Sequence, residues 1–424
     1  MFRIEIEKDN EIFNWYYSIE NNTFYNTNKE PIEIDYTNNA SFGKGTLIVR
    51  LSLGMKCNYC CKYCSENSNK DKIVESCKDY DKFVDNLHTF LSKYGNIEQY
   101  SCISFSFWGG EPLVYFDEIK ELAPRLTKKF KNCRLAFSTN GELLDFEKYK
   151  FIDEYNVIVG ISHDGPGQFV RHHKDILEPG TVQYDVIKKL ITERYDRTLF
   201  QPVFHKYNSS LVDYINFLEE KLNTNKFLLG ELAFLRVYDE KSKEYSLSED
   251  QLKSLSYEII QTSINADNCS TMRKYYEQNV AGFYNGYGKS LCLSENKVFT
   301  TCLVGHNYFS IDLSGNVWTC HNNTGQEKDE CGNILKLGNI YTDTYKKADF
   351  SILKHRQLTK CKDCFLANIC LGGCSMTELK YEEINCLTYF YRKYPILHIS
   401  IHFLTEGGNI IYIENLNGDN HGGD

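Results

Sequence analysis

The sequence contains no run of about 20 apolar residues, the length that a membrane-spanning helix requires. The apolar segment that comes nearest, Pro395 to Leu404, is only as long as a strand. The stretch from Met1 to Asn10 is charged and has no apolar core, so it does not read as a signal peptide. These absences argue against a membrane partner and predict a cytoplasmic protein.

The chain also lacks an excess of positive charge. It has 48 Lys and Arg against 57 Asp and Glu, a net charge of −9. Binding of nucleic acid phosphates requires a basic face, so nucleic acid is not expected as a partner. A hydrophobic fraction of 42% and a charged fraction of 25% are typical of a soluble globular protein. The length of 424 residues suits two or three domains.

Cysteine, by contrast, is abundant. The chain has 17 cysteines, nine of them between Cys292 and Cys386. Disulfides are not expected in a reducing cytosol, where clustered cysteines indicate metal or catalytic sites. The odd number also fits a framework of disulfide pairs poorly.

One cysteine cluster organises the first half of the chain. Cys57, Cys61 and Cys64 have the spacing C-x3-C-x2-C, and Tyr63 precedes the last of them. Three thiolates in one loop can hold three irons of a [4Fe–4S] cluster and leave the fourth iron open to an external ligand. A zinc site or three free cysteines are the alternatives that the loop alone leaves open.

Apolar strands alternate with helical patterns through the middle of the chain. Such a rhythm predicts an α/β fold with a parallel sheet and helices outside it. Helices are expected around Asp81–Tyr94 and after the capping-box pattern Ser248–Gln251. Six units are too few for an eight-fold barrel. The expected strands are Thr46–Leu53, Ile103–Phe107, Arg134–Phe137, Val157–Ile161, Leu199–Phe204 and Leu232–Val237.

Polar segments follow four of these strands. They are the cysteine loop, Gly109–Pro112, Ser138–Gly141 and Ser162–Gly165. The C-terminal ends of parallel strands carry the chemistry in α/β barrels, so these segments are expected to form one site. Gly109 and Gly110 have no Cβ and allow a close approach of a backbone or a ligand.

The cysteine loop, with Gly109–Pro112 one strand later, resembles the radical S-adenosylmethionine (SAM) superfamily. Near the C-terminus, Cys302 and Cys320 precede a C-x2-C-x5-C-x3-C run and a later cysteine. This pattern resembles the SPASM domain, which binds two auxiliary [4Fe–4S] clusters. The resemblance implies a partial (β/α)6 TIM-type barrel followed by a SPASM domain. It also implies three [4Fe–4S] clusters and SAM as cofactors.

The resemblance also implies roles for individual residues. Gly110 and Glu111 are expected at the SAM ammonium, and Arg171 at its carboxylate. The other expected SAM contacts are Tyr63, Thr139, Asn140, Ser162 and Asp164. The expected ligands are Cys57, Cys61 and Cys64 for the SAM cluster, Cys302, Cys320 and Cys374 for the first auxiliary cluster, and Cys361, Cys364, Cys370 and Cys386 for the second. No residue is identified as catalytic.

One departure from the family pattern concerns the first auxiliary cluster. Many relatives place a fourth ligand a few residues after the first cysteine, but Leu303–Phe309 contains no cysteine. His306 or Cys292 is a candidate for that ligand, or one iron stays open.

Four segments are expected. Residues 1–44 form an extension with strands Phe2–Glu7 and Pro31–Asp35, which caps the barrel or helps to hold a peptide. Residues 45–288 form the barrel and residues 289–390 the SPASM domain. Residues 391–424 contain strand-like runs, Ile396–Leu404 and Asn409–Ile413, and a flexible tail.

The resemblance implies an enzyme that generates a 5′-deoxyadenosyl radical and abstracts hydrogen from an unactivated C–H bond. Most relatives with a SPASM domain act on peptides or proteins. We therefore expect a maturase that installs a carbon–carbon, ether or thioether crosslink in a ribosomally made precursor peptide. The alternatives are a formylglycine-generating, sulfatase-maturing enzyme and a peptide epimerase. A non-catalytic iron–sulfur electron carrier belongs to a different class. An external electron donor such as flavodoxin or ferredoxin is the second expected partner.

Overall fold

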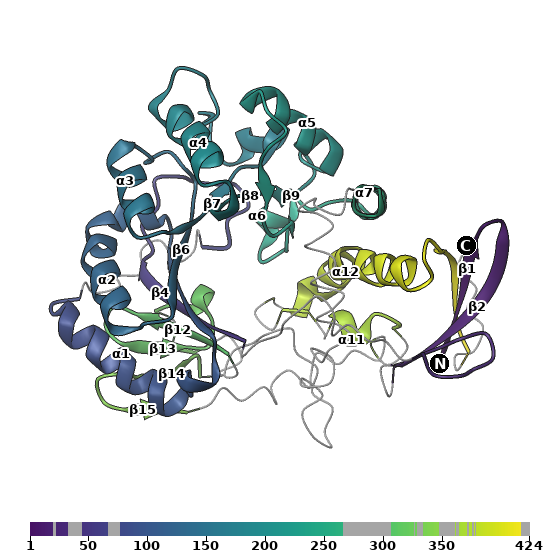
Figure 1. Cartoon of the computed structure of the whole chain (residues 1–424), viewed down its shortest axis with the longest axis horizontal. Helices are drawn as coiled ribbons and strands as arrows, with labels where there is room; N and C mark the ends of the chain where they lie inside the picture. The colour runs from purple at the N-terminus through teal and green to yellow at the C-terminus, as the bar shows by residue number, and fades with distance from the viewer. Residues whose placement is uncertain are drawn as a thin grey trace.

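The computed structural model describes most of the chain. The described residues are 1–19, 23–32, 45–66, 77–265, 307–325, 327–328, 334–346, 361, 364–370, 373–374, 377 and 379–416. Figure 1 shows a curved α/β unit from β4 to α7, with α12 and a small sheet of the two chain ends beside it. No helix among the described residues has the length and apolar character to cross a membrane.

A ten-stranded sheet forms the centre of the α/β unit. Its order is β10-β8-β7-β6-β5-β4-β12-β13-β14-β15. The pairs from β10 to β12 are parallel, and the remaining pairs are antiparallel. The strands are β4 (Thr46–Gly54), β5 (Cys102–Gly109), β6 (Cys133–Thr139), β7 (Ile158–Ser162), β8 (Thr198–Gln201), β10 (Leu228–Leu229), β12 (Tyr308–Asp312), β13 (Asn316–Trp318), β14 (Lys336–Asn339) and β15 (Thr344–Tyr345).

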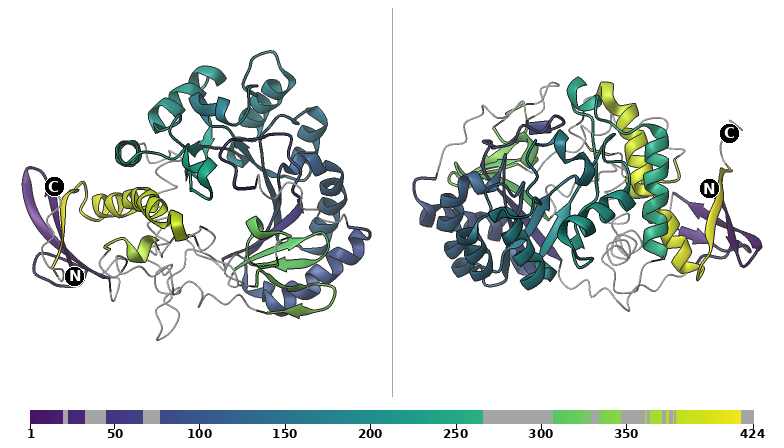
Figure 2. Two further views of the ribbon diagram at one scale, coloured as in Figure 1. Left: turned by 180° about the vertical axis from the view of Figure 1, so that it is seen from behind. Right: turned by 90° about the horizontal axis from the view of Figure 1, so that it is seen from above.

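Helices cover the outside of this sheet (Figures 1 and 2). Their starts follow local chemistry, because Asp79, Asp145, Thr181, Ser210 and Ser248 each accept a hydrogen bond from a backbone N–H of the first turn. The α-helices are α1 (Tyr80–Tyr94), α2 (Phe116–Lys129), α3 (Phe146–Glu154), α4 (Val182–Glu193), α5 (Leu211–Leu222), α6 (Glu240–Lys243) and α7 (Glu249–Ile264). The 3-10 helices are η2 (Ile97–Gln99), η3 (Pro112–Tyr115), η4 (Gly165–Val170), η5 (Tyr195–Arg197), η7 (His321–Asn323) and η9 (Leu379–Tyr381).

The expected α/β fold with a largely parallel sheet is confirmed, and the first four predicted strands correspond to β4–β7. The fifth predicted strand is split at Pro202 into β8 and β9 (Val203–Phe204), because proline has no N–H for the ladder. The sixth is reduced to β11 (Ala233–Phe234), which pairs with β9 alone. Strand β12, which extends the sheet beside β4, was not predicted.

The prediction of a strand at Ile396–Leu404 is wrong, because these residues form the last turns of helix α12 (Glu382–Leu404). Every residue from Pro395 to Ile401 is buried, so the sequence shows no apolar stripe of helical period here. Helix α12 packs against α7 and runs through the expected boundary between residues 390 and 391. The short helix α11 (Ala367–Cys370) lies against α12.

The two ends of the chain form a second, antiparallel sheet. Its order is β16-β1-β2-β3, from β16 (Asn409–Asn415), β1 (Phe2–Lys8), β2 (Glu11–Ser18) and β3 (Thr23–Tyr25). The predicted strands Phe2–Glu7 and Asn409–Ile413 are confirmed, whereas Pro31 forms only a bridge to Tyr25. Residues 33–35 and the expected tail beyond residue 416 lie outside the described residues.

The terminal sheet does not cap the barrel as expected. It packs against the C-terminal part of the chain, where Phe2 meets the ring of Phe365 and β16 contacts α12. Figure 2 shows it beside α12, at the other end of the molecule from α1. The buried residues Phe2, Ile4 and Ile6 form its inner face. The position argues against a direct role of this sheet in closing the site.

Candidate active site

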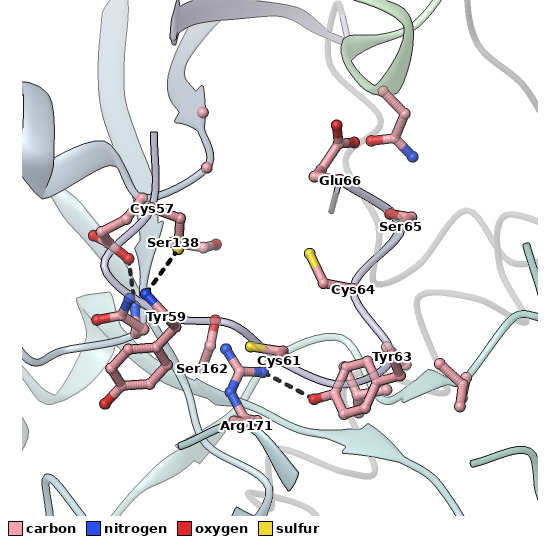
Figure 3. Close-up of a pocket in the computed structure, with 18 of the residues that line it drawn as sticks. Cys57, Tyr59, Cys61, Tyr63, Cys64, Ser65, Glu66, Ser138, Ser162 and Arg171 are labelled. Carbon is pink, nitrogen blue, oxygen red and sulfur yellow. Dashed lines mark hydrogen bonds between the residues drawn. The ribbon is translucent and has the colours of Figure 1, made fainter. Parts of the chain in front are cut away.

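A cavity of about 290 Å³ opens where the strands of the α/β unit end. Its wall comes from the loop after β4 and from the ends of β5, β6, β7, β9 and β11, so it lies at the edge where parallel strands carry functional groups. Part of the wall is shown in Figure 3. The lining residues used below are Cys57, Cys61, Tyr63, Cys64, Glu66, Trp108, Gly109, Gly110, Glu111, Ser138, Asn140, Ser162, Arg171, Val203, Leu235, Arg236 and Tyr238.

Three thiols line the cavity together. Cys57, Cys61 and Cys64 all belong to its wall, whereas the neighbouring Cys60 is exposed and does not (Figure 3). Burial raises the pKa of the Cys64 thiol to about 11, and the adjacent Cys61 adds to the rise. The Cys57 sulfur accepts a hydrogen bond from the Tyr59 N–H at 3.3 Å. The loop therefore presents Cys61, and not Cys60, together with Cys57 and Cys64.

These thiols suit an iron–sulfur cluster in kind and in location. As the side chains stand, no group of three or more His, Cys, Asp or Glu residues in the described part of the chain is arranged to hold a metal ion. The three side chains therefore have to turn toward one point to serve as ligands.

Two glycines fix the start of the cysteine loop against β5. A Cβ on Gly110 would lie 2.4 Å from the Met55 carbonyl oxygen, and one on Gly109 would lie 2.4 Å from the Gly54 carbonyl oxygen. The Gly110 N–H donates to Gly54 O at 3.0 Å, and the Glu111 N–H donates to Lys56 O at 3.0 Å. The glycines are therefore required so that the cysteine loop can lie directly on the end of β5.

Glu111 joins the ends of two strands. Its carboxylate accepts hydrogen bonds from the Thr139 hydroxyl (2.7 Å), the Asn140 N–H (2.8 Å) and the Leu113 N–H (3.0 Å). Only 1% of Glu111 is exposed, and burial raises the pKa of its carboxyl although these hydrogen bonds oppose the rise. Glu111 lines the cavity and also holds β5 against β6.

Asp164 forms a buried polar network beneath the cysteine loop. The Tyr63 hydroxyl and the Val203 N–H donate to its carboxylate, and Arg171 Nη1 lies 3.6 Å from it. Arg171 also donates to the Tyr63 hydroxyl at 3.2 Å. Burial raises the pKa of Asp164, but Arg171 and then His205 outweigh it, so the pKa falls below its ordinary value. Asp164 is therefore a carboxylate that holds Arg171 and Tyr63 in place.

The comparisons with known proteins agree with this geometry. Residues 51–218, which include the cysteine loop, Gly109–Pro112 and Asp164, match the radical SAM superfamily. The chain carries a radical SAM domain. It is an enzyme, as its relatives are, rather than an electron carrier.

The relatives extend the similarity beyond the radical SAM domain. The serine-type anaerobic sulfatase-maturating enzyme of Bacteroides thetaiotaomicron is 23% identical, over 80% of this chain and 84% of its own length. The radical SAM cyclopropyl synthase TigE of Paramaledivibacter caminithermalis is 25% identical, over 82% of this chain and 72% of its own length. Native anSMEcpe with bound AdoMet and the Cp18Cys peptide has the same fold, with a TM-score of 0.59, 22% identity and coverage of 85% of this chain and 98% of that chain.

The structure brings most of the predicted SAM contacts of the radical SAM domain to the cavity. Gly110, Glu111, Asn140, Ser162, Arg171 and Tyr63 line it. Thr139 and Asp164 are buried and do not, since their side chains are bonded to Glu111 and to the Tyr63–Arg171 pair. The assignment of a SAM contact to each residue stays a prediction.

Five of the C-terminal cysteines share neighbours in two sets. Cys374 and Cys320 are both near Tyr238, whose pKa is raised by burial and, more weakly, by these two thiols. Burial raises the pKa of Cys364 to about 11, and Cys386 and Cys361 add to it. The thirteen cysteines in the described part of the chain are free thiols. Cys302 lies outside the described residues, as do the candidate ligands Cys292 and His306.

Several residues at the cavity were not found from the sequence. Arg236 and Tyr238 follow β11 and line the wall without belonging to any motif. The Tyr115 hydroxyl accepts a hydrogen bond from the Lys56 N–H at 2.8 Å and supports the start of the cysteine loop. Isolated residues of this kind give no spacing signal, so only their positions in the fold reveal them.

Proposed function

We propose that the chain is a peptide maturase that installs a crosslink in a ribosomally made peptide. One hydrogen atom would leave an unactivated C–H bond, a second hydrogen would leave as a proton and an electron when the new bond forms, and an auxiliary cluster would take up that electron. The observation that carries the proposal is the convergence of three thiols and the Gly109–Gly110 turn on one cavity. One similarity supports a peptide substrate: anSMEcpe, which has the same fold, has been solved with the Cp18Cys peptide.

Different residues at the cavity would bind the cluster and the separate groups of SAM. Cys57, Cys61 and Cys64 would hold the cluster that, with SAM, supplies the hydrogen-abstracting chemistry when bound. Gly110 and Glu111 would meet the SAM ammonium, and Arg171 its carboxylate, with Tyr63 and Asp164 keeping the guanidinium in position. Asn140 and Ser162 supply polar groups to the same wall.

The apolar part of the wall has a separate task. Trp108, Val203 and Leu235 line the cavity beside these polar groups. An apolar wall excludes water from the cavity, which strengthens the polar contacts that would hold SAM and the substrate there. The Arg50 guanidinium lies 4.4 Å from the Trp108 ring centre and holds that ring in place.

The auxiliary sites are part of the same proposal. Cys302, Cys320 and Cys374 would hold one cluster, and Cys361, Cys364, Cys370 and Cys386 another, as in a SPASM domain. The proximity of Cys361 and Cys386 to Cys364 supports the second set. A cytoplasmic location and a flavodoxin- or ferredoxin-type electron donor complete the proposal.

Sulfatase maturation is the second candidate function. The similarity to the serine-type anaerobic sulfatase-maturating enzyme favours it as strongly as TigE favours crosslinking. The two reactions leave different products on a peptide substrate. A crosslink removes hydrogen without adding a carbonyl group, whereas formylglycine carries an aldehyde that reacts with a hydrazide.

The deciding experiment measures 5′-deoxyadenosine after dithionite and SAM are added to the anaerobically reconstituted protein. The wild type is expected to release it and to hold about twelve irons, from three four-iron clusters. The triple variant Cys57→Ala, Cys61→Ala, Cys64→Ala is expected to lose about four irons and all cleavage. Cys60→Ala is the matched control, because Cys60 is exposed in the same loop. Cleavage that survives in the triple variant would overturn the assignment.

A further inference from the structure

Arg236 and Tyr238 occupy the cavity wall just after β11. The residue before them, Leu235, packs against Tyr63 of the cysteine loop, so this segment lies next to the thiols. The residue between them, Val237, is fully buried, and its N–H and C=O are each held by the Asn385 side chain at 2.9 Å. The side chains of Arg236 and Tyr238 therefore project from a backbone segment whose central residue is held by two hydrogen bonds.

Among the described residues, four charged side chains line this cavity, and the protein itself engages three of them. Glu111 accepts three hydrogen bonds, and Arg171 is held by Tyr63 and Asp164. Glu66 likewise has an interaction within the protein. In the described part of the chain, no side chain or backbone group forms a hydrogen bond or ion pair with the Arg236 guanidinium. The cation is thus left available to a molecule in the cavity.

The surroundings of Arg236 keep it charged but do not neutralise it. Burial lowers the pKa of its guanidinium, but Tyr238, Tyr389, Cys374 and Glu231 outweigh this effect and raise the pKa well above its ordinary value. The carboxylate among these neighbours, Glu231, forms its ion pair with Arg392. An unpaired cation in a largely buried place is costly unless a ligand supplies the opposite charge.

On the basis of the proposed function, we propose that Arg236 binds a carboxylate of the peptide substrate, with the Tyr238 hydroxyl as a second donor. The planar guanidinium offers paired N–H groups that match the two oxygens of a carboxylate. The carboxylate belongs to an Asp or Glu side chain or to a free C-terminus. Recognition at this wall places the neighbouring residue of the peptide beside the cysteine loop.

The test uses two pools of synthetic peptides with randomised sequences, one with a free C-terminal carboxylate and one amidated. Each pool is captured on the reconstituted, SAM-supplemented enzyme and sequenced by mass spectrometry. The wild type is expected to enrich Asp and Glu in both pools if a side chain is recognised. If the C-terminus is recognised, it enriches the free-acid pool over the amidated pool.

Charge variants make the assignment specific. Arg236→Gln is expected to reduce the enrichment about tenfold or more, Arg236→Lys to retain part of it, and Arg236→Glu to select Lys and Arg instead. Tyr238→Phe, which keeps the ring, is expected to weaken the enrichment in the same direction. A wild type that shows no preference for carboxylates would overturn the proposal, as would an Arg236→Glu variant that selects the same peptides as the wild type.

Iron content distinguishes a structural role of Arg236 at the Cys374 site from a role in peptide binding. If Arg236→Gln loses iron yet selects the same peptides as the wild type, the guanidinium serves the Cys374 site and the proposal is overturned. If a charge variant does not fold, Tyr238→Phe decides, because an unchanged enrichment in that variant contradicts the second donor. Failure of the proposed function would appear separately, as a wild type that does not cleave SAM.

Discussion

The side-chain amide of Asn385 hydrogen-bonds to both backbone polar groups of Val237. It accepts from the N–H and donates to the C=O, each at 2.9 Å, and only 2% of Asn385 is exposed. This pair joins helix α12 to the segment that follows β11, across the boundary between the α/β unit and the cysteine-rich C-terminal region. Asn385 directly precedes Cys386. The same turn of α12 therefore carries an expected cluster ligand and the side chain that holds the cavity wall at Val237.

Loss of this pair is expected to separate the two regions. Asn385→Leu leaves two buried backbone groups without partners, which is expected to lower the free energy of unfolding by about 2–4 kcal/mol. Urea unfolding followed by circular dichroism is expected to show an earlier transition. Asn265→Ala removes an exposed amide at the end of α7 and serves as the control, with a change below about 0.5 kcal/mol. Equal midpoints for Asn385→Leu and the wild type would contradict the role of this contact.

The glycine turn is expected to be intolerant of a single methyl group. Gly110→Ala places a Cβ 2.4 Å from Met55 O and 2.6 Å from Lys56 O, both backbone atoms that cannot rotate away. The cysteine loop then cannot dock on β5, and we expect about four irons fewer after reconstitution. Gly45→Ala is the matched control, since a Cβ there meets nothing within 4 Å. Full iron content in Gly110→Ala would show that loop docking is not needed for the cluster.

Glu111 is expected to affect both stability and SAM affinity. Glu111→Ala removes an acceptor of three hydrogen bonds at a buried position, with a cost of about 2–4 kcal/mol. SAM binding measured by calorimetry on the reconstituted protein is expected to weaken more than iron content falls. Glu147→Ala, at a side chain that is 66% exposed, is the control. An unchanged SAM affinity would argue against the assigned ammonium contact.

Asp175 gives a prediction for acid stability. Burial raises the pKa of its carboxyl, but the hydrogen bond from His163 (2.9 Å) and the contacts with Leu177 N–H and Lys221 outweigh burial, so the pKa lies below its ordinary value. A lowered pKa means that the ionised group stabilises the fold above about pH 3.9, and that this contribution is lost as the pH falls through the folded-state pKa.

The variant Asp175→Asn is therefore expected to lower the free energy of unfolding by about 1–2 kcal/mol at pH 7 and by less at pH 3. Urea midpoints measured from pH 7 to pH 3 are expected to converge for variant and wild type. Asp196→Asn, whose side chain is 79% exposed, controls for the change of net charge. A difference in urea midpoint between variant and wild type that stays constant from pH 7 to pH 3 would contradict this explanation.

The parts of the molecule that the sequence predicts depend on local patterns. Strands β4–β7 are short apolar runs followed by polar residues. The spacing of the cysteines and the Gly-Gly-Glu motif identify individual site residues directly. The C-terminal half of α12 gave a wrong prediction, since every residue from Pro395 to Ile401 is buried and the apolar run has no helical period. Pairing of β12 with β4 joins distant segments, which no local pattern encodes.

The candidate site shows the same division. Glu111 and the three thiols were found because they belong to motifs, whereas Arg236 and Tyr238 were not, because only the fold brings them to the cavity. Asp164 was expected to touch SAM; its side chain accepts hydrogen bonds from the Tyr63 hydroxyl and from the Val203 N–H, and the SAM contact stays a prediction. A motif identifies which residues belong to a site, and the structure separates those that face the cavity from those that support them.

The pairing of β1 with β16 joins the two ends of the chain, so the terminal sheet cannot be completed until synthesis is nearly finished. A nascent chain presents β1, β2 and β3 long before β16 leaves the ribosome, so one edge of β1 stays open during nearly all of synthesis. An open edge that carries Ile4 and Ile6 invites pairing with other chains. Proteolysis that removes β16 from the finished molecule would recreate that edge, and aggregation of such clipped protein is the outcome to expect.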